Sequence, residues 1–563
     1  MRKYLRFIDG FRKFAKGRMQ PEEAATTART FIRKRMAARE GNFLNLMQKG
    51  VFGYAPSPYL KLLQPKKITF ADLKSWVSRY GIEAALNTLE HEGVYFTVDE
   101  FKGKVPVVRE GIQFRCEEGM FDNPFLSCAY EVRSGATRSA GTRVRIDFDY
   151  LHHRSLYDAL LLDIHGCLQA PIANWFPIFP GAPGINSSLR FAHIGNPAKR
   201  WFSQVAADDL RVNWEKRWGT KLIFGMSKLY GNPLAQPEFA GLNDARKIAE
   251  WAAQVLEEHP HCVVYTFAAS AVRVCIAAAE ANRSIKGTKF LVTGEPLTPQ
   301  KRSEIESAGA LAVPVYGISE AGVIAAGCSQ PYAESDHCHL YNDTTAIIAH
   351  QHRVAHSDTT VDSYLFTSLL YECPKLLLNV GMGDYGMIDT CACECEFEKA
   401  GFSRHLSNIR SYEKLTGEGV TFVDTDFIRI IETELPERFG GRSTDYQLVE
   451  EEDARGFTHL SLVVSPRVGT VDEQAVVRSF MGLLKHSEAS PESWAQSGTE
   501  MWNQSGMVRV VRDFPMPTAS GKVLPFHLMK PSVVTRHESV ETIQKETIAD
   551  GIPSTTTETV AAK

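Results

Sequence analysis

Apolar positions between residues 244 and 317 follow two alternating spacings. Segment 244–260, DARKIAEWAAQVLEEHP, places Ile248, Trp251 and Val255 three to four residues apart, which predicts a helix. The apolar run 261–267, HCVVYTF, follows it and predicts a buried strand. The same order then repeats, with helices predicted over 270–283 and 299–309 and strands over 289–294 and 310–317. This rhythm predicts a layered α/β sheet, and ligands usually bind where the strands of such a sheet end.

A second unit is predicted from about residue 410. It contains a strand-like run at 459–466, a helical pattern at 472–487 and another strand at 507–514, which together indicate a small α+β domain. With 563 residues, the chain is long enough for more than one domain. Beyond Pro531 the composition turns to Ser, Thr, Glu and Lys, which cannot bury enough apolar surface to offset ordering, so a disordered tail is expected. We therefore expect domains at 1–409 and 410–530 and a tail at 531–563.

The N-terminal segment is basic and carries Tyr4, Ile8, Phe11 and Phe14 at helical spacing. It lacks the uninterrupted apolar core of a signal peptide, so an amphipathic helix is predicted. Such a helix can dock on its own protein or rest on an anionic membrane surface, and docking is the favoured alternative. No apolar run approaches the ~20 residues that a membrane span needs.

Charge and cysteine content narrow the classes of function. The formal net charge of −3 and the pI near 6.6 argue against a general nucleic-acid binder, which would show a basic excess. Eleven cysteines scattered over the chain do not form the dense framework of a secreted disulfide scaffold. A reduced, cytoplasmic location and small-molecule chemistry are expected.

Two turns follow predicted strands and carry polar groups. Their residues are Tyr316-Gly317-Ile318-Ser319-Glu320, after strand 310–317, and Gly294-Glu295-Pro296-Leu297, after strand 289–294. The first resembles the YGxTE motif of the adenylate-forming superfamily, and the second resembles the GEPL segment of its phenylacetate-CoA-ligase-like branch. By this resemblance Tyr316 lines an adenine site and Glu320 ligates the Mg²⁺ that bridges ATP phosphates, a role for a hard oxygen donor.

Two further segments fit the same order. Asn379-Val380-Gly381-Met382-Gly383-Asp384-Tyr385-Gly386 resembles the TGD motif of the superfamily. By that resemblance Asp384 accepts hydrogen bonds from both ribose hydroxyls, and two carboxylate oxygens suit a vicinal diol. Segment 409–419, IRSYEKLTGEG, resembles the stretch that opens the C-terminal domain, in which Arg410 would contact the nucleotide. The usual hinge Asp or Lys is replaced by Tyr412 or Glu413.

The last motif lies near the end of the chain. Pro517-Thr518-Ala519-Ser520-Gly521-Lys522 resembles the PxTxxGK motif that supplies the catalytic lysine of adenylation. The resemblance implies that the ammonium of Lys522 bridges the substrate carboxylate and the α-phosphate and stabilises charge as pyrophosphate departs.

A Ser/Thr/Gly-rich stretch at 133–143, RSGATRSAGTR, occupies the place of the phosphate loop. Relatives have a run such as TSGSTG, whose small residues let backbone amides approach phosphates. Ser134, Gly135 and Thr137 fit the pattern, but Arg138 replaces the closing glycine. Two outcomes follow: a loop that binds pyrophosphate with help from Arg138, which we favour, or a site with weakened ATP turnover.

The five motifs imply an enzyme of the superfamily that contains acyl-CoA synthetases, peptide-synthetase adenylation domains and firefly luciferase. The resemblance implies a large ATP- and carboxylate-binding domain, a small mobile domain that carries Lys522, and ATP and Mg²⁺ as cofactors. A carboxylic acid would form an acyl-adenylate and pyrophosphate, and the acyl group would pass to the thiol of CoA or of a carrier protein's phosphopantetheine.

Several alternatives stay open from the sequence. The acyl acceptor could be an amine or a protein side chain, and the chain could be a non-catalytic nucleotide- or carboxylate-binding homologue. The small residues of segment 265–270, YTFAAS, suggest room for an acyl group, with ordinary strand-to-helix packing as the alternative. The resemblance to phenylacetate-CoA ligase implies an aryl or other compact acid, with aliphatic or amino acids as alternatives. The sequence does not decide between a monomer and a homodimer.

A separate group of sulfur and imidazole donors suits Zn²⁺. His337 and His339 flank Cys338, and Cys391, Cys393 and Cys395 cluster after the Asp384 motif. If the fold joins these loops, a tetrahedral structural zinc site would be formed by Cys328, His339, Cys393 and Cys395. The alternative is a set of free thiols near a turn, since Cys-x-Cys is less usual than Cys-x2-Cys in zinc sites.

Overall fold

The computed structural model describes most of the chain. The described residues are 2–126, 130–133, 142–178, 183–205, 214–231, 233–353, 360–412, 414–417, 420–423, 430–442, 445–453, 455, 457–485, 506–516 and 526–527. Residues 1–529 fall into one compact unit and residues 530–563 into a second. The predicted tail at 531–563 lies outside the described residues, and the predicted boundary at 409/410 stays a prediction.

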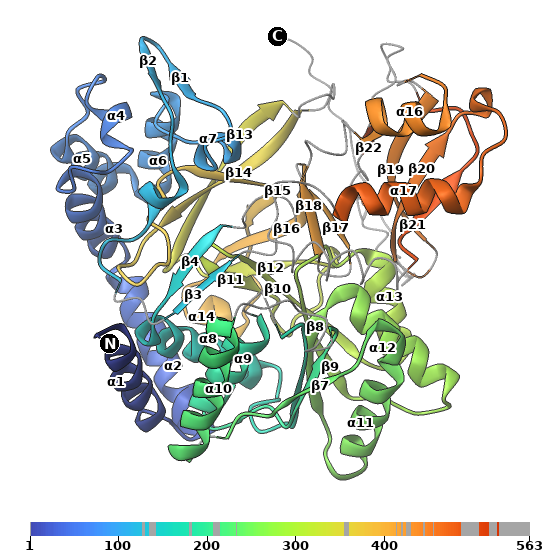
Figure 1. The fold of residues 1–563 in the computed structure, drawn as a ribbon. Coiled ribbons are helices and arrows are strands. Elements are labelled where there is room, and N and C mark those ends of the chain that lie inside the picture. Colours follow the sequence, from blue (N-terminus) through green and yellow to red (C-terminus); the bar gives the residue numbers. More distant parts are fainter. Residues whose placement is uncertain are drawn as a thin grey trace, which may run out of the picture. The chain divides into compact units, whose positions relative to one another are not determined.

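A sheet of twelve strands dominates the fold, in the order β13-β14-β15-β16-β12-β11-β10-β9-β8-β5-β6-β7 (Figure 1). Its parallel part contains β5 Ile172–Trp175, β6 Arg200–Ser203, β7 Pro237–Phe239, β8 Cys262–Phe267, β9 Thr288–Thr293 and the first half of β10 Leu311–Ile318. Its antiparallel part contains β11 Gly322–Ala326, β12 Cys338–Leu340, β13 Thr345–Arg353, β14 Thr360–Ser368, β15 Val380–Thr390 and β16 Arg404–Ser411. Strand β10 joins the two parts, because it pairs with β9 through 311–314 and with β11 through 315–318.

The helices lie between and around these strands in the sequence. Their bounds are α1 Arg2–Lys16, α2 Pro21–Ala37, α3 Arg39–Met47, α4 Leu60–Leu63, α5 Phe70–Tyr80, α6 Ile82–His91, α7 Val98–Phe101, α8 Phe148–Ile164, α9 Pro183–His193, α10 Trp214–Leu229, α11 Ala245–Glu258, α12 Ala268–Glu280, α13 Pro299–Ser307, α14 Glu396–Lys399, α16 Leu435–Phe439 and α17 Glu473–Lys485. Side-chain caps fix the first residues of two helices, α8 and α13. Asp147 accepts from the Tyr150 amide at the start of α8, and Thr298 accepts from the Lys301 amide before Pro299 begins α13.

The smaller sheets are separate from the large one. A four-stranded sheet, β21-β20-β19-β22, consists of β19 Tyr446–Glu452, β20 Thr458–Val464, β21 Val508–Val511 and β22 Phe526–His527. Three two-stranded ribbons are β1 Val107–Arg109 with β2 Ile112–Phe114, β3 Tyr130–Arg133 with β4 Arg143–Ile146, and β17 Lys414–Gly417 with β18 Val420–Val423. The predicted α/β class, with a large sheet followed by a smaller α+β unit, is confirmed.

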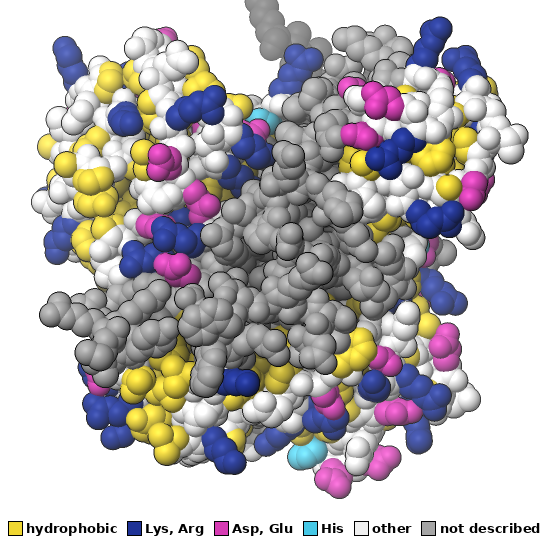
Figure 2. Space-filling view, in the orientation of Figure 1, with side chains coloured by type: hydrophobic (Ala, Val, Ile, Leu, Met, Phe, Trp, Pro, Cys, Tyr) yellow, Lys and Arg dark blue, Asp and Glu magenta, His cyan; other side chains and the backbone are white. Residues whose placement is uncertain are grey.

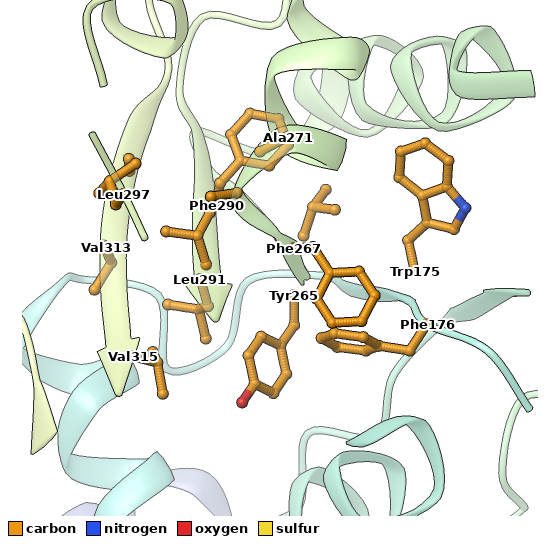
Figure 3. Close-up of a cluster of buried hydrophobic side chains, with 14 of the residues drawn as sticks. Trp175, Phe176, Tyr265, Phe267, Ala271, Phe290, Leu291, Leu297, Val313 and Val315 are labelled. Carbon is orange, nitrogen blue, oxygen red and sulfur yellow. The ribbon is translucent and has the colours of Figure 1, made fainter. Parts of the chain in front are cut away.

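The centre of the parallel sheet is buried and mostly apolar. All six residues of β8 are buried, and α11 and α12 pack against it. Figure 3 shows the ring of Phe267 beside Phe176, whose centroids lie 5.0 Å apart at 84°, with Trp175 on the neighbouring strand. Strands that are covered on both faces need continuous apolar runs, and burial of each large side chain contributes about 1.5–3 kcal/mol. This is why HCVVYTF forms the strand that the sequence predicts.

The N-terminal helix α1 docks on its own protein, as predicted. Phe11 and Phe14 are buried, and both rings lie 5.6 Å from the ring of Phe148 in α8. Ile8 faces outward with 38% exposure, and Phe7 takes the inward position instead. The docking follows from the aromatic stripe of the helix, which buries more apolar area against α8 than a charged face could.

The surface and the helices agree with the charge pattern of the sequence. On the coloured parts of the face in Figure 2, basic and acidic side chains are interspersed. Among the described residues, every helix is too short or too polar to traverse a bilayer.

Candidate active site

A cavity of about 410 Å³ opens where the parallel strands end, within the ~300–1,000 Å³ typical of small-molecule sites. Its walls include residues at the ends of β8, β9 and β10 and the first half of β15. The predicted site residues that line it are Gly294, Glu295, Pro296, Tyr316, Gly317, Ser319, Glu320, Asp384 and Arg410. Side chains that are up to 116 positions apart in the sequence, from Gly294 to Arg410, therefore surround one space.

The turn between β10 and β11 is shaped by two glycines. The register shifts between Tyr316 and Gly317, and a Cβ on Gly317 would lie 2.7 Å from the Gly322 carbonyl oxygen. Gly322 has φ +78°, and a Cβ there would lie 1.7 Å from the hydroxyl of Tyr150. Only glycine combines this backbone conformation with such a close approach. The resulting bulge presents Ser319 to the cavity.

Tyr316 and Asp384 are directly connected. The hydroxyl of Tyr316 donates a hydrogen bond of 2.9 Å to Oδ2 of Asp384, and Asp384 is 9% exposed. Burial, together with the neighbouring carboxylate, raises the pKa of Tyr316 well above its usual value. The phenol therefore stays protonated and holds the Asp384 carboxylate at the cavity wall.

Glu320 lies on the same turn and is 7% exposed. Its backbone oxygen accepts a hydrogen bond from the amide of Lys375, which holds the turn against the segment before β15. Within the part of the chain that the structure describes, the Glu320 carboxylate has no hydrogen-bond or ion-pair partner, although it borders the cavity. A carboxylate that borders the cavity offers the hard oxygen donors that a cation such as Mg²⁺ prefers.

The Gly294-Glu295-Pro296 segment borders the cavity in a different way. Oε1 of Glu295 accepts from the amide of Ala269 at 2.6 Å, and Oε2 lies 3.4 Å from the ammonium of Lys301. Both charged side chains are fully buried. The Glu295 side chain therefore holds the start of α12 to the end of β9, and a ligand in the cavity would meet the backbone of this segment.

Arg410 has a partner that sequence reasoning missed. Its Nη1 lies 3.0 Å from Oδ2 of Asp336, which also accepts from the Ile409 amide at 2.8 Å. Oδ1 of Asp336 accepts from the amide of Asn408, whose φ is +53°. Asp336 thus stabilises a bulge in β16 and orients Arg410 at the cavity wall. The only sequence signal was an acidic residue 74 positions away, in a polar loop.

A second polar group borders the cavity near the end of β8. Nε of Arg190 in α9 lies 2.5 Å from Oδ2 of Asp158 in α8, and Arg190 is 8% exposed. Burial raises the pKa of Asp158, although the Arg190 charge acts in the opposite direction. Tyr265 lies beside the pair, and its hydroxyl points away from Phe267 and Trp175 (Figure 3). Both charged residues lie within helices, and no local motif marks them as site residues.

The small residues of the predicted acyl pocket are not at the cavity. Tyr265 and Phe267 line it, whereas Ala268, Ala269 and Ser270 are buried at the start of α12. The Ser270 hydroxyl accepts from the Gln204 amide at 2.9 Å. The interpretation that these small residues leave room for the acyl group is wrong, because they let the helix pack closely on the sheet instead.

Several predicted residues fall outside the described part of the chain. They are Ser134, Gly135, Thr137 and Arg138 of the predicted phosphate loop, and Lys522. The loop joins β3 to β4, which pair as a hairpin, and Val132 and Thr142 on either side of it line the cavity. Lys522 precedes β22, the edge strand of the four-stranded sheet. Their roles stay predictions.

The four predicted zinc ligands come together away from the cavity. Cys328, His339, Cys393 and Cys395 each place one donor atom within 4.8 Å of the other three. Nε2 of His339 lies 3.4 Å from Sγ of Cys393 and 3.3 Å from Sγ of Cys395. Nδ1 of His339 lies 2.6 Å from the carbonyl oxygen of Phe402, which makes Nδ1 the protonated nitrogen and turns the Nε2 lone pair toward the thiols.

Comparisons with known proteins find structural neighbours only. No family model and no curated protein matches the chain. A 2-hydroxyisobutyryl-CoA ligase, solved with 2-HIB-AMP and CoA, is 14% identical over 90% of this chain and 89% of its own, with a TM-score of 0.49. A malonyl-CoA ligase with methylmalonyl-CoA and AMP is 11% identical over 80% and 95%, with a TM-score of 0.39. The amide bond synthetase McbA from Marinactinospora thermotolerans is 13% identical over 74% and 71%, with a TM-score of 0.35. Likenesses of this degree do not assign an activity.

Proposed function

We propose that this protein activates a carboxylic acid with ATP and forms an acyl-adenylate. The observation that carries the proposal is the convergence of Glu320, Asp384, Tyr316 and Arg410 on one cavity at the carboxyl ends of parallel strands. The sequence motifs imply, by resemblance, a role at ATP for each of these residues. A set of unrelated surface turns has no reason to share one cavity.

Each residue has a distinct part in the proposed reaction. Asp384 accepts from the ribose hydroxyls, with its second oxygen held by Tyr316. Glu320 would hold Mg²⁺, which would supply positive charge beside the phosphates. A substrate carboxylate oxygen attacks the α-phosphorus, the bond to the β-phosphate oxygen breaks, and pyrophosphate leaves. Lys522 of the predicted 410–530 domain would stabilise this charge, and Arg410 would contact the nucleotide.

The second half-reaction transfers the acyl group to a thiol, from CoA or from the phosphopantetheine of a carrier protein. The thiolate attacks the acyl carbon, and AMP leaves with the electron pair of the broken mixed-anhydride bond. Movement of the predicted 410–530 domain, and of Lys522 with it, would expose the adenylate to the thiol. An amine or a protein side chain is the alternative acceptor.

The acyl end of the cavity favours a compact acid with polar groups. Tyr265, Phe267 and the Asp158–Arg190 pair line that end. Phe267 offers an apolar face to a ring or a short chain. The phenol of Tyr265 and the buried ion pair offer hydrogen bonds to a hydroxyl or amino substituent, so hydroxylated aryl or short hydroxy acids are the first acids to assay.

We also propose that Cys328, His339, Cys393 and Cys395 bind a structural Zn²⁺. Four soft donors at mutual distances of a few ångströms match a closed tetrahedral site. Zinc would join the loop after β11, strand β12 and the loop after β15, and it would bring no chemistry to the cavity.

Pyrophosphate exchange tests the proposed activity. The full chain, MgATP and a panel of carboxylic acids should give acid-dependent exchange, and Glu320→Gln should abolish it. Asp384→Ala should raise the KM for ATP about 10-fold or more, because charged hydrogen bonds of about 1.5–3 kcal/mol are lost. The exposed Glu257→Gln is the matched control and should behave as the wild type.

Three outcomes are informative. Exchange that is lost in Glu320→Gln and retained in Glu257→Gln supports the proposal. Tight ATP binding without exchange for any acid would identify a non-catalytic homologue instead. An ATP KM that does not change in Asp384→Ala would remove this carboxylate from the nucleotide site.

A further inference from the structure

A second set of metal-binding groups lies beside the four-residue cluster. His337, Cys391 and His405 each place one donor atom within 4.8 Å of the other two. None of the three belongs to the cluster of Cys328, His339, Cys393 and Cys395, and none lines the cavity. Sequence reasoning did not select them as ligands.

Three neighbouring strands carry these residues. His337 immediately precedes β12, Cys391 immediately follows β15, and His405 is the second residue of β16. Strand β16 pairs with both neighbours, so that His405 lies opposite His339 on one side and Asp389 on the other. The backbone ladder therefore fixes the three donors before any ion arrives.

The distances fit two nitrogens on one ion. Nε2 of His337 and Nδ1 of His405 lie 3.0 Å apart. Two nitrogens on a tetrahedral Zn²⁺, each at about 2.0–2.1 Å from it, are separated by about 3.3–3.4 Å. A separation of 3.0 Å is therefore within a few tenths of an ångström of the value for two nitrogens on one ion.

Burial makes a ligand-free arrangement costly. His337 is 8% exposed and His405 is 1% exposed. Nδ1 of His337 has no hydrogen-bond partner among the described residues, and the ring of Tyr332 stacks on His337 with centroids 3.4 Å apart. This burial keeps bulk water away from the two nitrogens proposed as ligands, Nε2 of His337 and Nδ1 of His405.

The donor types also suit a metal, because imidazole nitrogens and a thiolate are the ligands that Zn²⁺ prefers. Cys391 is only partly buried, and its thiol must lose a proton to bind. Binding would release that proton to solvent, and the thiolate would offset half of the charge of a divalent ion.

We propose that His337, Cys391 and His405 bind a second divalent ion of the Zn²⁺ class. Three protein donors leave a fourth position for water, so this ion exchanges more readily than one in the closed four-ligand site. The rings of His339 and His405 have centroids 4.0 Å apart, which makes the two sites neighbours. The protein would then hold two zinc ions per chain, one retained and one exchangeable.

The position of this ion links it to the nucleotide site. His337 directly follows Asp336, the carboxylate that holds the Arg410 bulge of β16. His405 lies five positions before Arg410 on the same strand. The second ion would therefore fix both ends of the β12–β16 pairing that orients Arg410, while making no contact with the cavity.

Zinc content of the purified full chain tests the proposal. Elemental analysis should give two zinc per wild-type chain and one per Cys391→Ala chain. The matched control, Cys275→Ala, removes a buried thiol in α12 and should keep two. Dialysis of the wild type against a chelator at millimolar concentration should leave one zinc. Cys393→Ala should lose the ion of the four-ligand site, so this variant tests that site independently of the second one.

A difference of one zinc between the wild type and Cys391→Ala supports the second site, whichever total is found. Equal zinc in both would overturn it and leave the two imidazoles joined by a hydrogen bond only. If Cys391→Ala does not fold, titration of the metal-free wild type with Co²⁺ decides. If a second equivalent of Co²⁺ binds and its visible absorption band is that of an ion with one thiolate ligand, the site is supported. Saturation at one equivalent of Co²⁺ contradicts it.

Discussion

Replacement of Asp336 by Asn tests whether this buried carboxylate holds the end of β16. Asp336 is 5% exposed and accepts from two backbone amides and from Arg410, which is itself 7% exposed. The amide of Asn has one acceptor oxygen, so it can serve either the Asn408 amide or the Ile409 amide with Arg410. In both orientations a buried donor faces the NH₂ group of Asn.

The magnitude follows from the burial of the pair. Removing one partner of a buried ion pair costs about 3–5 kcal/mol, because the remaining charge is left without compensation. That is a large share of the ~5–15 kcal/mol by which a folded protein is stable. Urea unfolding should show this loss for Asp336→Asn, and the ATP KM should rise because Arg410 is no longer oriented.

Two controls make the result specific. The exposed Asp362 on β14 pairs only with Gln351 among the described residues, so Asp362→Asn should change the free energy of unfolding by less than about 0.5 kcal/mol. In a double-mutant cycle, Arg410→Met should cost less in the Asp336→Asn background than in the wild type. Additive effects, or a loss no larger than that of Asp362→Asn, would refute the reasoning.

Two further predictions concern packing around the site. His193 is 2% exposed and stacks on Phe14 of α1, and burial lowers its pKa to about 4, below the ~6.5 of an exposed histidine. The undocked state binds the extra proton, so docking of α1 loses about 2 kcal/mol between pH 7 and pH 5. Hydrogen exchange of α1, corrected for intrinsic rates, should accelerate accordingly, and His193→Gln should flatten this dependence; equal protection at both pH values would contradict it. Gly322→Ala should lower the Tm by several degrees, because φ +78° costs an L-residue about 1–2 kcal/mol and the methyl group displaces Tyr150. The control Gly225→Ala on α10 has open space around it and should leave the Tm unchanged or raise it. Equal Tm changes in the two variants would show that the β10–β11 turn tolerates a side chain.

The strands and helices of the parallel sheet could be predicted from the sequence because burial forces a local pattern. The run 261–267 is β8 to within one residue, and 299–309 contains α13 with its Thr298 cap. The site could be predicted in part, since Tyr316 lies near the end of β10 and Glu320 in the turn after it, whereas Asp384 lies within the antiparallel strand β15. Prediction of the site at the end of β10 depends on one rule: the carboxyl ends of parallel strands meet at one edge of the sheet.

Long-range pairings could not be predicted in the same way. Asp336 and Arg410 are 74 positions apart, and Asp158 lies on a helix where an acidic residue is usually solvated. Nothing local distinguishes a carboxylate that will be buried against a guanidinium from one that faces water. The small residues 268–270 were misinterpreted for a related reason, because close packing and an open pocket both select Ala and Ser.

Strand β16 connects the two kinds of site in this molecule. Its start carries His405 at the proposed second ion, and its end carries Arg410 at the cavity, about 17 Å along an extended strand. Strand β12 pairs with the start of β16, and the loop before it supplies Asp336 to the end. A shift of β12 against β16 would therefore move His337 and Asp336 together. Loss of the exchangeable ion should therefore raise the KM for ATP while the retained zinc stays bound. The two sites are coupled because β16 extends from His405 to Arg410.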